Sequence, residues 1–207
     1  MKPRTSISLL VAALGLTVSA TAADWPNWRG PFHNGSTTET GLPATFSKTE
    51  NVKWVIDLPG RAASTPIVWG DRVFLTGTDE ETKTLLVYCL NRADGATVWR
   101  HEVGVGISRD ERSNYASPSP VTDGKLVYFF FGNGELLAHD FAGQKVWSRN
   151  IQKDYGEFAF QWTFSTSPVL HDGRLYLQVL QRDRPVNGRG RADGPNDSYL
   201  LALNPAT

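Results

Sequence analysis

Three stretches of this chain combine arginine and amide side chains with aromatic rings, and these residue types could hold a ligand. The stretches span residues 59–64, 104–116 and 154–166. A guanidinium can donate two parallel hydrogen bonds to a carboxylate, and an aromatic ring beside it can stack on a planar group. The expected ligand is therefore a flat, anionic molecule. The candidate binding residues are Arg61, Arg112, Asn114, Tyr115, Gln161 and Trp162. Arg109 and Phe164 lie in the same stretches.

The sequence contains no pattern that identifies a catalytic residue or a metal ligand. The four histidines, at positions 33, 101, 139 and 171, are scattered and lack the spacing of metal ligands. Gly104-Val-Gly106 is too short for a dinucleotide-binding loop, and the chain has no Gly-x-Ser-x-Gly elbow. Acidic residues fall in polar loops, where solvated side chains are usual. The single cysteine, Cys89, is expected to be a small buried apolar residue.

The three stretches are positioned by a sequence repeat of short strands and turns. Each copy begins with a proline-led apolar strand, passes a tight turn into a longer apolar strand, and ends at a tryptophan. The prolines Pro66, Pro120 and Pro168 lie 54 and 48 residues apart. Short strands and tight turns at such a period are typical of a radial β-repeat. The serines that precede the prolines (positions 64, 119 and 167) are expected to bond local backbone where the inner strand begins.

The second copy shows the expected plan of four antiparallel strands. They are expected at 118–121, 126–131, 136–139 and 145–149, and Asn133-Gly134 favours a two-residue hairpin turn. The tryptophan of the outer strand supplies a broad apolar plate, and the glycine four residues earlier leaves room for a ring from the adjacent unit. The residues of this structural motif are Trp54, Gly95, Trp99, Gly143 and Trp147.

The segments from Leu90 to Trp99 and from Ala138 to Trp147 resemble the tryptophan-docking motif, Ala-x-Asp-x-x-x-Gly-x-x-x-Trp, of quinoprotein-like β-propellers. The opening from Asp24 to Pro31 is similar to the start of secreted proteins with pyrroloquinoline-quinone-binding-like repeats. The resemblance covers residues 52–207 and implies an all-β fold, a β-propeller of four-stranded antiparallel blades. The chain then supplies an incomplete arc of about three to four blades of a seven- or eight-blade ring.

The expected organisation has three parts. Residues 1–22 have a basic start, an apolar run and a small-x-small site at Ala20-Thr-Ala22, which predict a cleaved signal peptide. A short membrane anchor is the alternative, but the run is well below the roughly 20 residues that span a bilayer. Residues 23–51 are expected to be irregular, and 52–207 to form a partial propeller with blades at 52–101, 102–150 and 151–207.

Fewer than four blades leave open sheet edges, so we expect the chain to be the N-terminal part of a longer protein. A four-blade ring, or a ring closed by oligomerisation, is the alternative. In a propeller the three ligand-binding stretches cross one face toward the axis. They either bind a ligand there or line a solvent-filled funnel.

The resemblance implies two kinds of function. One kind is non-enzymatic propellers such as the outer-membrane assembly lipoprotein, and the other is quinone-dependent alcohol and sugar dehydrogenases that use pyrroloquinoline quinone with calcium. We expect a binding or scaffold module for a protein or small ligand, which uses the loops of this face and the loop at 182–197. The alternative is a pyrroloquinoline-quinone-dependent oxidoreductase whose catalytic groups lie partly outside this sequence.

The charge balance excludes some partners. The chain has 21 basic and 21 acidic residues, so no net field draws it to nucleic acid or to an anionic membrane. No segment beyond the N-terminal run is long and apolar enough to be transmembrane. With a signal peptide, the expected location is periplasmic or secreted.

Overall fold

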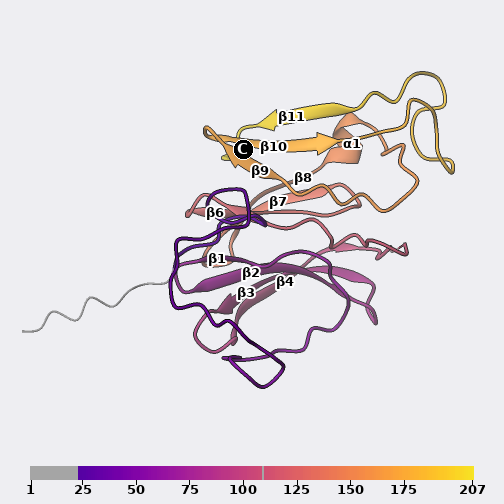
Figure 1. Ribbon diagram of the computed structural model, residues 1–207. Helices are drawn as coiled ribbons and strands as arrows, with labels where there is room; N and C mark the ends of the chain where they lie inside the picture. Colours follow the sequence, from indigo (N-terminus) through magenta and orange to yellow (C-terminus); the bar gives the residue numbers. More distant parts are fainter. Residues whose placement is uncertain (1–22, 109) are drawn as a thin grey trace, which may run out of the picture.

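The computed structural model describes residues 23–108 and 110–207, so the predicted signal peptide and Arg109 lie outside the described residues. In this part of the chain, three antiparallel sheets stand side by side (Figure 1). The first sheet contains β1 (Ile67–Trp69), β2 (Arg72–Asp79), β3 (Thr84–Asn91) and β4 (Thr97–Val105). The second contains β5 (Val121–Thr122), β6 (Leu126–Phe130), β7 (Glu135–Asp140) and β8 (Lys145–Asn150), and the short helix α1 (Ile151–Tyr155) follows it. The third contains β9 (Val169–His171), β10 (Arg174–Val179) and β11 (Tyr199–Leu203).

The turns form where the sequence predicts them, but the turn at Asn133-Gly134 is longer than the two-residue hairpin expected there. The N–H of Phe131 bonds to the carbonyl oxygen of Glu135 at 2.9 Å, and of the two central residues only Gly134 has a positive φ. Gly124, between β5 and β6, and Gly134, between β6 and β7, have φ angles of 84° and 92°. Because L side chains rarely adopt such angles, glycine favours a tight reversal at both places. Neighbouring strands pair antiparallel throughout the three sheets, so the predicted all-β, antiparallel plan is confirmed, with four strands in each of the first two sheets.

Strand β6 shows why the sheets pack face to face. Its side chains alternate between two apolar clusters: Val127 and Phe129 pack toward the first sheet, and Tyr128 and Phe130 toward the third. All four side chains are fully buried. A strand that is covered on both faces carries a continuous apolar run, as predicted for this segment. The middle sheet is therefore the core of the arc.

A tryptophan joins the first sheet to the second. The indole Nε1 of Trp99, on β4, donates a hydrogen bond to the carbonyl oxygen of Phe141 at 3.1 Å. The ring lies against Gly143, where a Cβ atom would come within 2.8 Å of the indole Cγ. The indole satisfies its one polar group on the neighbouring sheet while its faces stay in the core. We call this contact the second joint.

Two other tryptophans occupy equivalent places. Trp54 precedes the first sheet, donates from Nε1 to the carbonyl oxygen of Arg92 at 2.9 Å, and packs on Gly95. We call this contact the first joint. Trp147, on β8, donates to the carbonyl oxygen of Pro205 at 2.9 Å, which forms the third joint. The same indole contact thus recurs at each step along the arc.

The serine hydroxyls do not bond local backbone, which corrects the expectation for them. Ser119 Oγ accepts a hydrogen bond from the backbone N–H of Thr65 at 2.8 Å, and Ser167 Oγ accepts from the N–H of Ser119 at 2.9 Å. The partners are 54 and 48 residues apart, because each hydroxyl reaches the inner edge of the preceding sheet. Ser64 Oγ is buried and has no hydrogen-bond partner among residues 23–108 and 110–207.

The N-terminal segment ties the inner strands of the first two sheets. Trp25 exchanges two backbone hydrogen bonds with Val68 of β1, at 2.8 and 2.9 Å. The next carbonyl oxygen, that of Pro26, accepts from the N–H of Thr122 in β5 at 3.0 Å. The segment therefore adds backbone pairing across the second joint.

Candidate functional site

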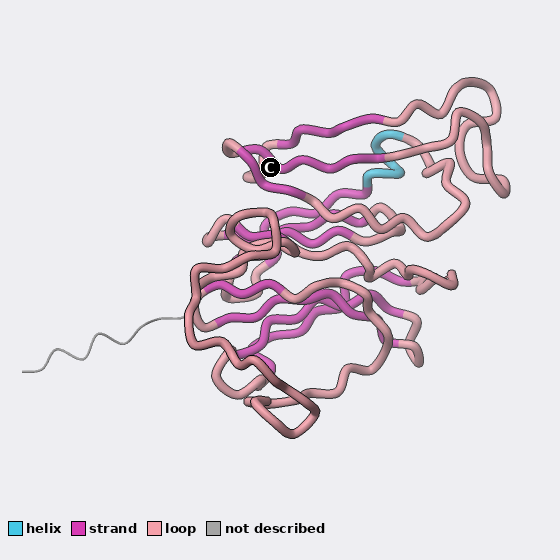
Figure 2. The backbone as a smooth tube through the Cα atoms, in the orientation of Figure 1, coloured by secondary structure: helices cyan, strands magenta, loops and turns pink. Residues whose placement is uncertain are grey.

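Loops gather at one end of the three sheets. Because the strands alternate in direction, the connection from β2 to β3 and the connection from β4 to β5 emerge at the same end, and this repeats in the other sheets. Figure 2 shows the longer loops together at the right of the view. We call this end the loop face. It contains residues 59–66, 80–83, 106–108, 110–120, 131–134, 151–168 and 180–198.

Two of the predicted binding residues share a cavity on the loop face. Arg61 and Asn114 both line a hollow of about 300 Å³, together with Lys83 and Glu80. The hydroxyl of Thr78 donates to the carbonyl oxygen of Arg61 at 2.7 Å and holds this loop against β2. The cavity therefore lies between the loops of the first and second sheets.

Two more predicted residues stack on each other. The guanidinium carbon of Arg112 lies 5.9 Å from the ring centroid of Trp162, within the range of a cation–π contact. The Trp162 side chain is 43% exposed and rests edge-on against Phe160, with the two ring centroids 5.7 Å apart. This pair presents a flat apolar surface beside a positive charge.

The remaining two predicted residues lie elsewhere. Gln161 Oε1 accepts a hydrogen bond from Arg182 Nη2 at 2.7 Å, at the edge of a hollow of about 390 Å³ formed with residues 182–187. Tyr115 packs against the core between the first two sheets, and its ring lies close to Gly132. The structure therefore places Arg61 with Asn114 and Arg112 with Trp162 on the loop face. Gln161 lies beside Arg182 instead, and Tyr115 is partly buried against the core.

Asp110 links the loop that carries Arg112 to the loop that carries Trp162. Its carboxylate accepts hydrogen bonds from the backbone N–H groups of Arg112 and Ser113, both at 2.8 Å, and of Thr163 at 2.6 Å. Partial burial acts to raise the pKa of Asp110, but the N–H groups, that of Thr163 foremost, outweigh it and lower the pKa to about 2. Sequence reasoning placed Asp110 only in a solvated loop, because Thr163 is 53 residues away.

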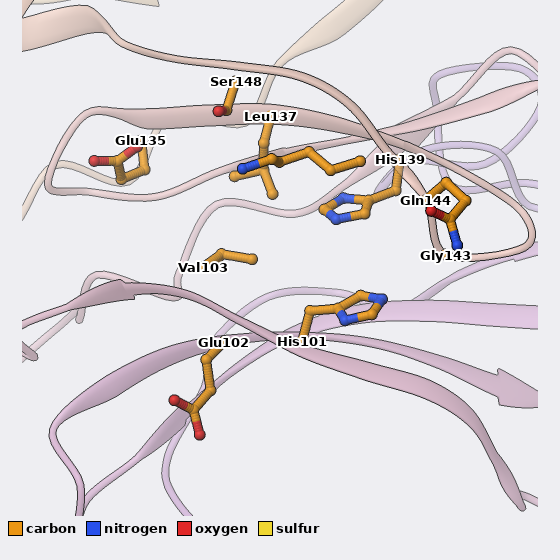
Figure 3. Close-up of a pocket in the computed structure, with 10 residues that line it drawn as sticks. His101, Glu102, Val103, Glu135, Leu137, His139, Gly143, Gln144 and Ser148 are labelled. Carbon is orange, nitrogen blue, oxygen red and sulfur yellow. The ribbon is translucent and has the colours of Figure 1, made fainter.

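A second cavity, of about 380 Å³, opens between β4 and the pair β7–β8 (Figure 3). His101 from β4 and His139 from β7 face each other there, with ring centroids 5.4 Å apart and ring planes 8° from parallel. Trp99 of the second joint stacks on both imidazoles, at 5.2 and 5.7 Å. The histidines had no recognisable spacing in the sequence, and the contact between sheets brings them together.

Comparison with known proteins places the chain in a family. Residues 36–182 match the family described as outer membrane protein assembly factor BamB. The chain belongs to this family. Among the relatives of this BamB-family chain, the polyvinylalcohol dehydrogenase of a Pseudomonas species is 24% identical over 182 residues, which are 87% of this chain and 26% of that protein. The chain therefore spans about a quarter of the length of that relative.

A similar solved structure supports the fold. The quinohemoprotein alcohol dehydrogenase from Comamonas testosteroni superposes with a TM-score of 0.57 and 16% identity, over 89% of this chain and 26% of that one. BamB from Moraxella catarrhalis gives a TM-score of 0.45 and 20% identity, over 62% and 37%. The predicted quinoprotein-like resemblance and the predicted fold class, an incomplete β-propeller arc, are confirmed. Each sheet of the BamB-family chain is a blade.

The loop face carries side chains of the types that bind a planar, carboxylated quinone. Arg112 and Trp162 suit the carboxylates and flat rings of such a group, since a guanidinium binds carboxylates and an indole stacks. Among residues 23–108 and 110–207, no three His, Cys, Asp or Glu side chains converge to hold a metal ion. Among the described residues of the BamB-family chain, these two side chains are of types that suit the organic anion, and no cluster of three metal-ligating side chains accompanies them.

Two further expectations concern single features. Cys89 is fully buried and free, and burial raises the pKa of its thiol to about 12, which confirms the apolar role expected for it. Within the part of the chain that the structure describes, no helix has both the length and the apolar character needed to cross a bilayer.

Replacing Asp110 with alanine is expected to lower the free energy of unfolding at pH 7 by about 1–2 kcal/mol, because three backbone N–H groups lose their acceptor. The contribution of Asp110 is complete above the unfolded pKa of about 3.9 and is lost as the pH falls toward its folded value of about 2. Urea unfolding at pH 7 and at pH 2.5 measures both effects.

Glu111→Ala is the matched control, since Glu111 is the exposed neighbour of Asp110. It should change the unfolding free energy by less than about 0.5 kcal/mol. If the two variants behave alike, the carboxylate of Asp110 does not join the two loops.

Proposed function

We propose that this chain forms part of an exported β-propeller binding module that holds an anionic partner, a protein or a small ligand, on its loop face. The observation that supports this most is the pair formed by Arg112 and the exposed ring of Trp162. The carboxylate of Asp110 holds the two loops of this pair together by accepting backbone hydrogen bonds from both. Stacking and forked hydrogen bonds can both act on a partner that reaches this pair.

Three arginines near the pair can bind an anion, and the carboxylates of Asp110, Glu111 and Asp183 lie in the same loops. Arg182 and Arg184 lie on the neighbouring loop and are exposed, and the Nη2 atom of Arg182 bonds to the neutral amide of Gln161. Among the described residues, neither these two arginines nor Arg112 forms an ion pair with a carboxylate. Their donors are therefore available to an incoming carboxylate at no cost of breaking an existing ion pair.

A second candidate function is a pyrroloquinoline-quinone-dependent oxidoreductase. Its support is the similarity to a polyvinylalcohol dehydrogenase over 87% of this chain. Since the chain spans 26% of that protein, catalytic groups of the kind expected for such an enzyme would come from other blades. In that case Arg112 and Trp162 would orient the quinone, which supplies the redox chemistry when bound.

Substituting Arg112 by alanine is expected to weaken binding of an anionic probe about tenfold, since one charge-assisted hydrogen bond is lost. Two probes separate the partner classes: pyrroloquinoline quinone, with and without calcium, represents a small ligand, and a hexaglutamate peptide represents an acidic protein segment. Binding is followed by tryptophan fluorescence and by thermal shift. Arg174→Ala, an exposed arginine at the start of β10, is the matched control.

Each result decides between the proposals. Binding of either probe that Arg112→Ala weakens and Arg174→Ala does not would support a binding role for the loop face. If the full-length protein binds neither probe, the binding proposal is wrong. Dye-linked oxidation of an alcohol in the presence of quinone and calcium would favour the oxidoreductase instead.

A further inference from the structure

Among the described residues, the second joint carries two imidazoles, that of His139 buried and that of His101 partly buried, where the first joint carries aliphatic side chains. His101 lies two residues after Trp99 on β4, and its Nε2 atom would be 3.0 Å from a Cβ atom at Gly143. At the first joint Ile56 takes the same place, two residues after Trp54, and its Cγ2 atom would be 3.2 Å from a Cβ atom at Gly95.

The residue that faces this position from the neighbouring strand also differs between the two joints. In the second sheet the N–H of Asp140 bonds across the turn to the carbonyl oxygen of Gln144, and His139 comes just before Asp140. In the first sheet the N–H of Asn91 bonds across the matching turn to the carbonyl oxygen of Ala96, and Leu90 comes just before Asn91. His139 in the second joint therefore corresponds to Leu90 in the first. Ile56 and Leu90 pack in one apolar cluster, so the first joint shows that an aliphatic pair fits this geometry.

Both imidazoles leave a nitrogen atom unsatisfied. His139 Nδ1 and His101 Nε2 are buried and have no hydrogen-bond partner in the described structure. His139 as a residue is only 2% exposed. A buried polar atom without a partner destabilises a fold, and the aliphatic pair of the first joint carries no such atom. The histidines therefore point to a property that an aliphatic pair cannot supply.

The charged groups around the two rings do not favour a proton on His139. Burial lowers the pKa of His139 to about 4, the positive charges of His101 and of Lys145 on β8 act in the same direction, and Asp140 opposes them. On the packed face of β6, the ring of Phe129 lies edge-on to His139, with the two ring centroids 6.1 Å apart. Glu135 and Glu102 also line the cavity, but Figure 3 shows both carboxylates away from the imidazoles, and Glu135 accepts from Asn150 at 2.9 Å.

We propose that the second joint is an acid-sensitive hinge, in which protonation of His139 separates β4 from β7 and β8 while the first and third joints stay closed. When His139 is protonated, its positive charge lies next to the imidazole of His101, with the two ring centroids 5.4 Å apart. Both rings also pack against Trp99, so the charge is placed within the contact between the two sheets. The adjoining cavity of about 380 Å³ gives the charged ring a route to water when the blades part.

The direction of the pH effect follows from the two states. In the open joint His139 is solvated and regains its ordinary pKa of about 6.5, so the open state binds the proton more tightly. Acidification from pH 6.5 toward 4 therefore favours opening, and above pH 6.5 this group has no effect. This window lies above the one in which Asp110 acts, so the two effects are separable.

Hydrogen exchange at pH 7.0 and pH 4.5 tests the hinge, after correction for the intrinsic pH dependence of exchange. Peptides from β4, β7 and β8 should exchange roughly tenfold to a hundredfold faster at pH 4.5, the range set by the difference between the two pKa values. Peptides from β10 and β11 should show no such change. Equal corrected rates at both pH values for β4, β7 and β8 would overturn the proposal.

The matched variant copies the first joint into the second, as His101→Ile with His139→Leu. It should remove the pH-dependent exchange of β4, β7 and β8. His139→Gln is the second variant, because it keeps a polar group without a titratable one and should have the same effect. His171→Gln, in an exposed position on β9, should exchange as the wild type does. Acid opening that persists in both joint variants would assign the effect to other groups and contradict the hinge.

Discussion

Replacing Trp99 with alanine is expected to lower the free energy of unfolding by about 3–5 kcal/mol, the cost of removing a large buried aromatic side chain. Trp99 is 8% exposed and contacts rings from both blades, among them Phe74 at 6.0 Å and Phe129 at 6.4 Å. The substitution leaves a cavity in the second joint and removes the donor to Phe141. Urea unfolding followed by far-ultraviolet circular dichroism measures the loss.

Two further substitutions separate the parts of this effect. Trp99→Phe keeps most of the apolar area and loses the hydrogen bond, so it should cost markedly less than alanine does. Trp28→Ala removes an indole that is 46% exposed and should cost less than about 1 kcal/mol. If Trp99→Ala were no more damaging than Trp28→Ala, the indole would not hold the two blades together.

Gly143→Ala is expected to destabilise the protein by about 2–6 kcal/mol, for two independent reasons. The backbone φ of Gly143 is 90°, an angle at which an L side chain costs roughly 1–3 kcal/mol. The new Cβ atom would also lie 2.8 Å from Trp99 Cγ and 3.0 Å from His101 Nε2, and overpacking of this kind costs about 1–3 kcal/mol. Thermal and urea unfolding of the purified variant measure the sum.

Gly173→Ala isolates the backbone part. Gly173 has a φ of 68°, and no atom lies within 4 Å of the place where a Cβ would stand. Its substitution should therefore cost only the strain, about 1–2 kcal/mol. Equal losses in the two variants would show that the close approach of Trp99 to Gly143 contributes nothing to stability.

Much of the fold could be predicted because the same apolar strands, glycine turns and tryptophan spacing recur along the chain. The apolar run at β6 identified a strand covered on both faces, and the positive φ angles of Gly124 and Gly134 follow from turns that are local in the sequence. The motif tryptophans were identified by spacing. The partners of their N–H groups were not, because those carbonyl groups lie 38 to 58 residues away in the next blade.

The candidate site was predicted less completely. Arg112 and Trp162 were selected by residue type alone, and the structure places them next to each other because loops that follow equivalent strands meet at one end of the arc. Tyr115 also has a suitable residue type, yet it packs against the core. The sequence could not predict this, because an aromatic ring on a short loop can turn either to solvent or to the adjacent sheet. Only its packing distinguishes the two outcomes.

The sequence by itself determined the strands, the turns and the radial plan, because periodicity and turn chemistry act over a few residues. The tertiary structure decided which groups meet across a joint. His101 and His139 face each other, and Asp110 reaches Thr163, only because neighbouring blades pack at one angle and in one register. Contacts of this kind depend on distances between sheets, which no local pattern encodes.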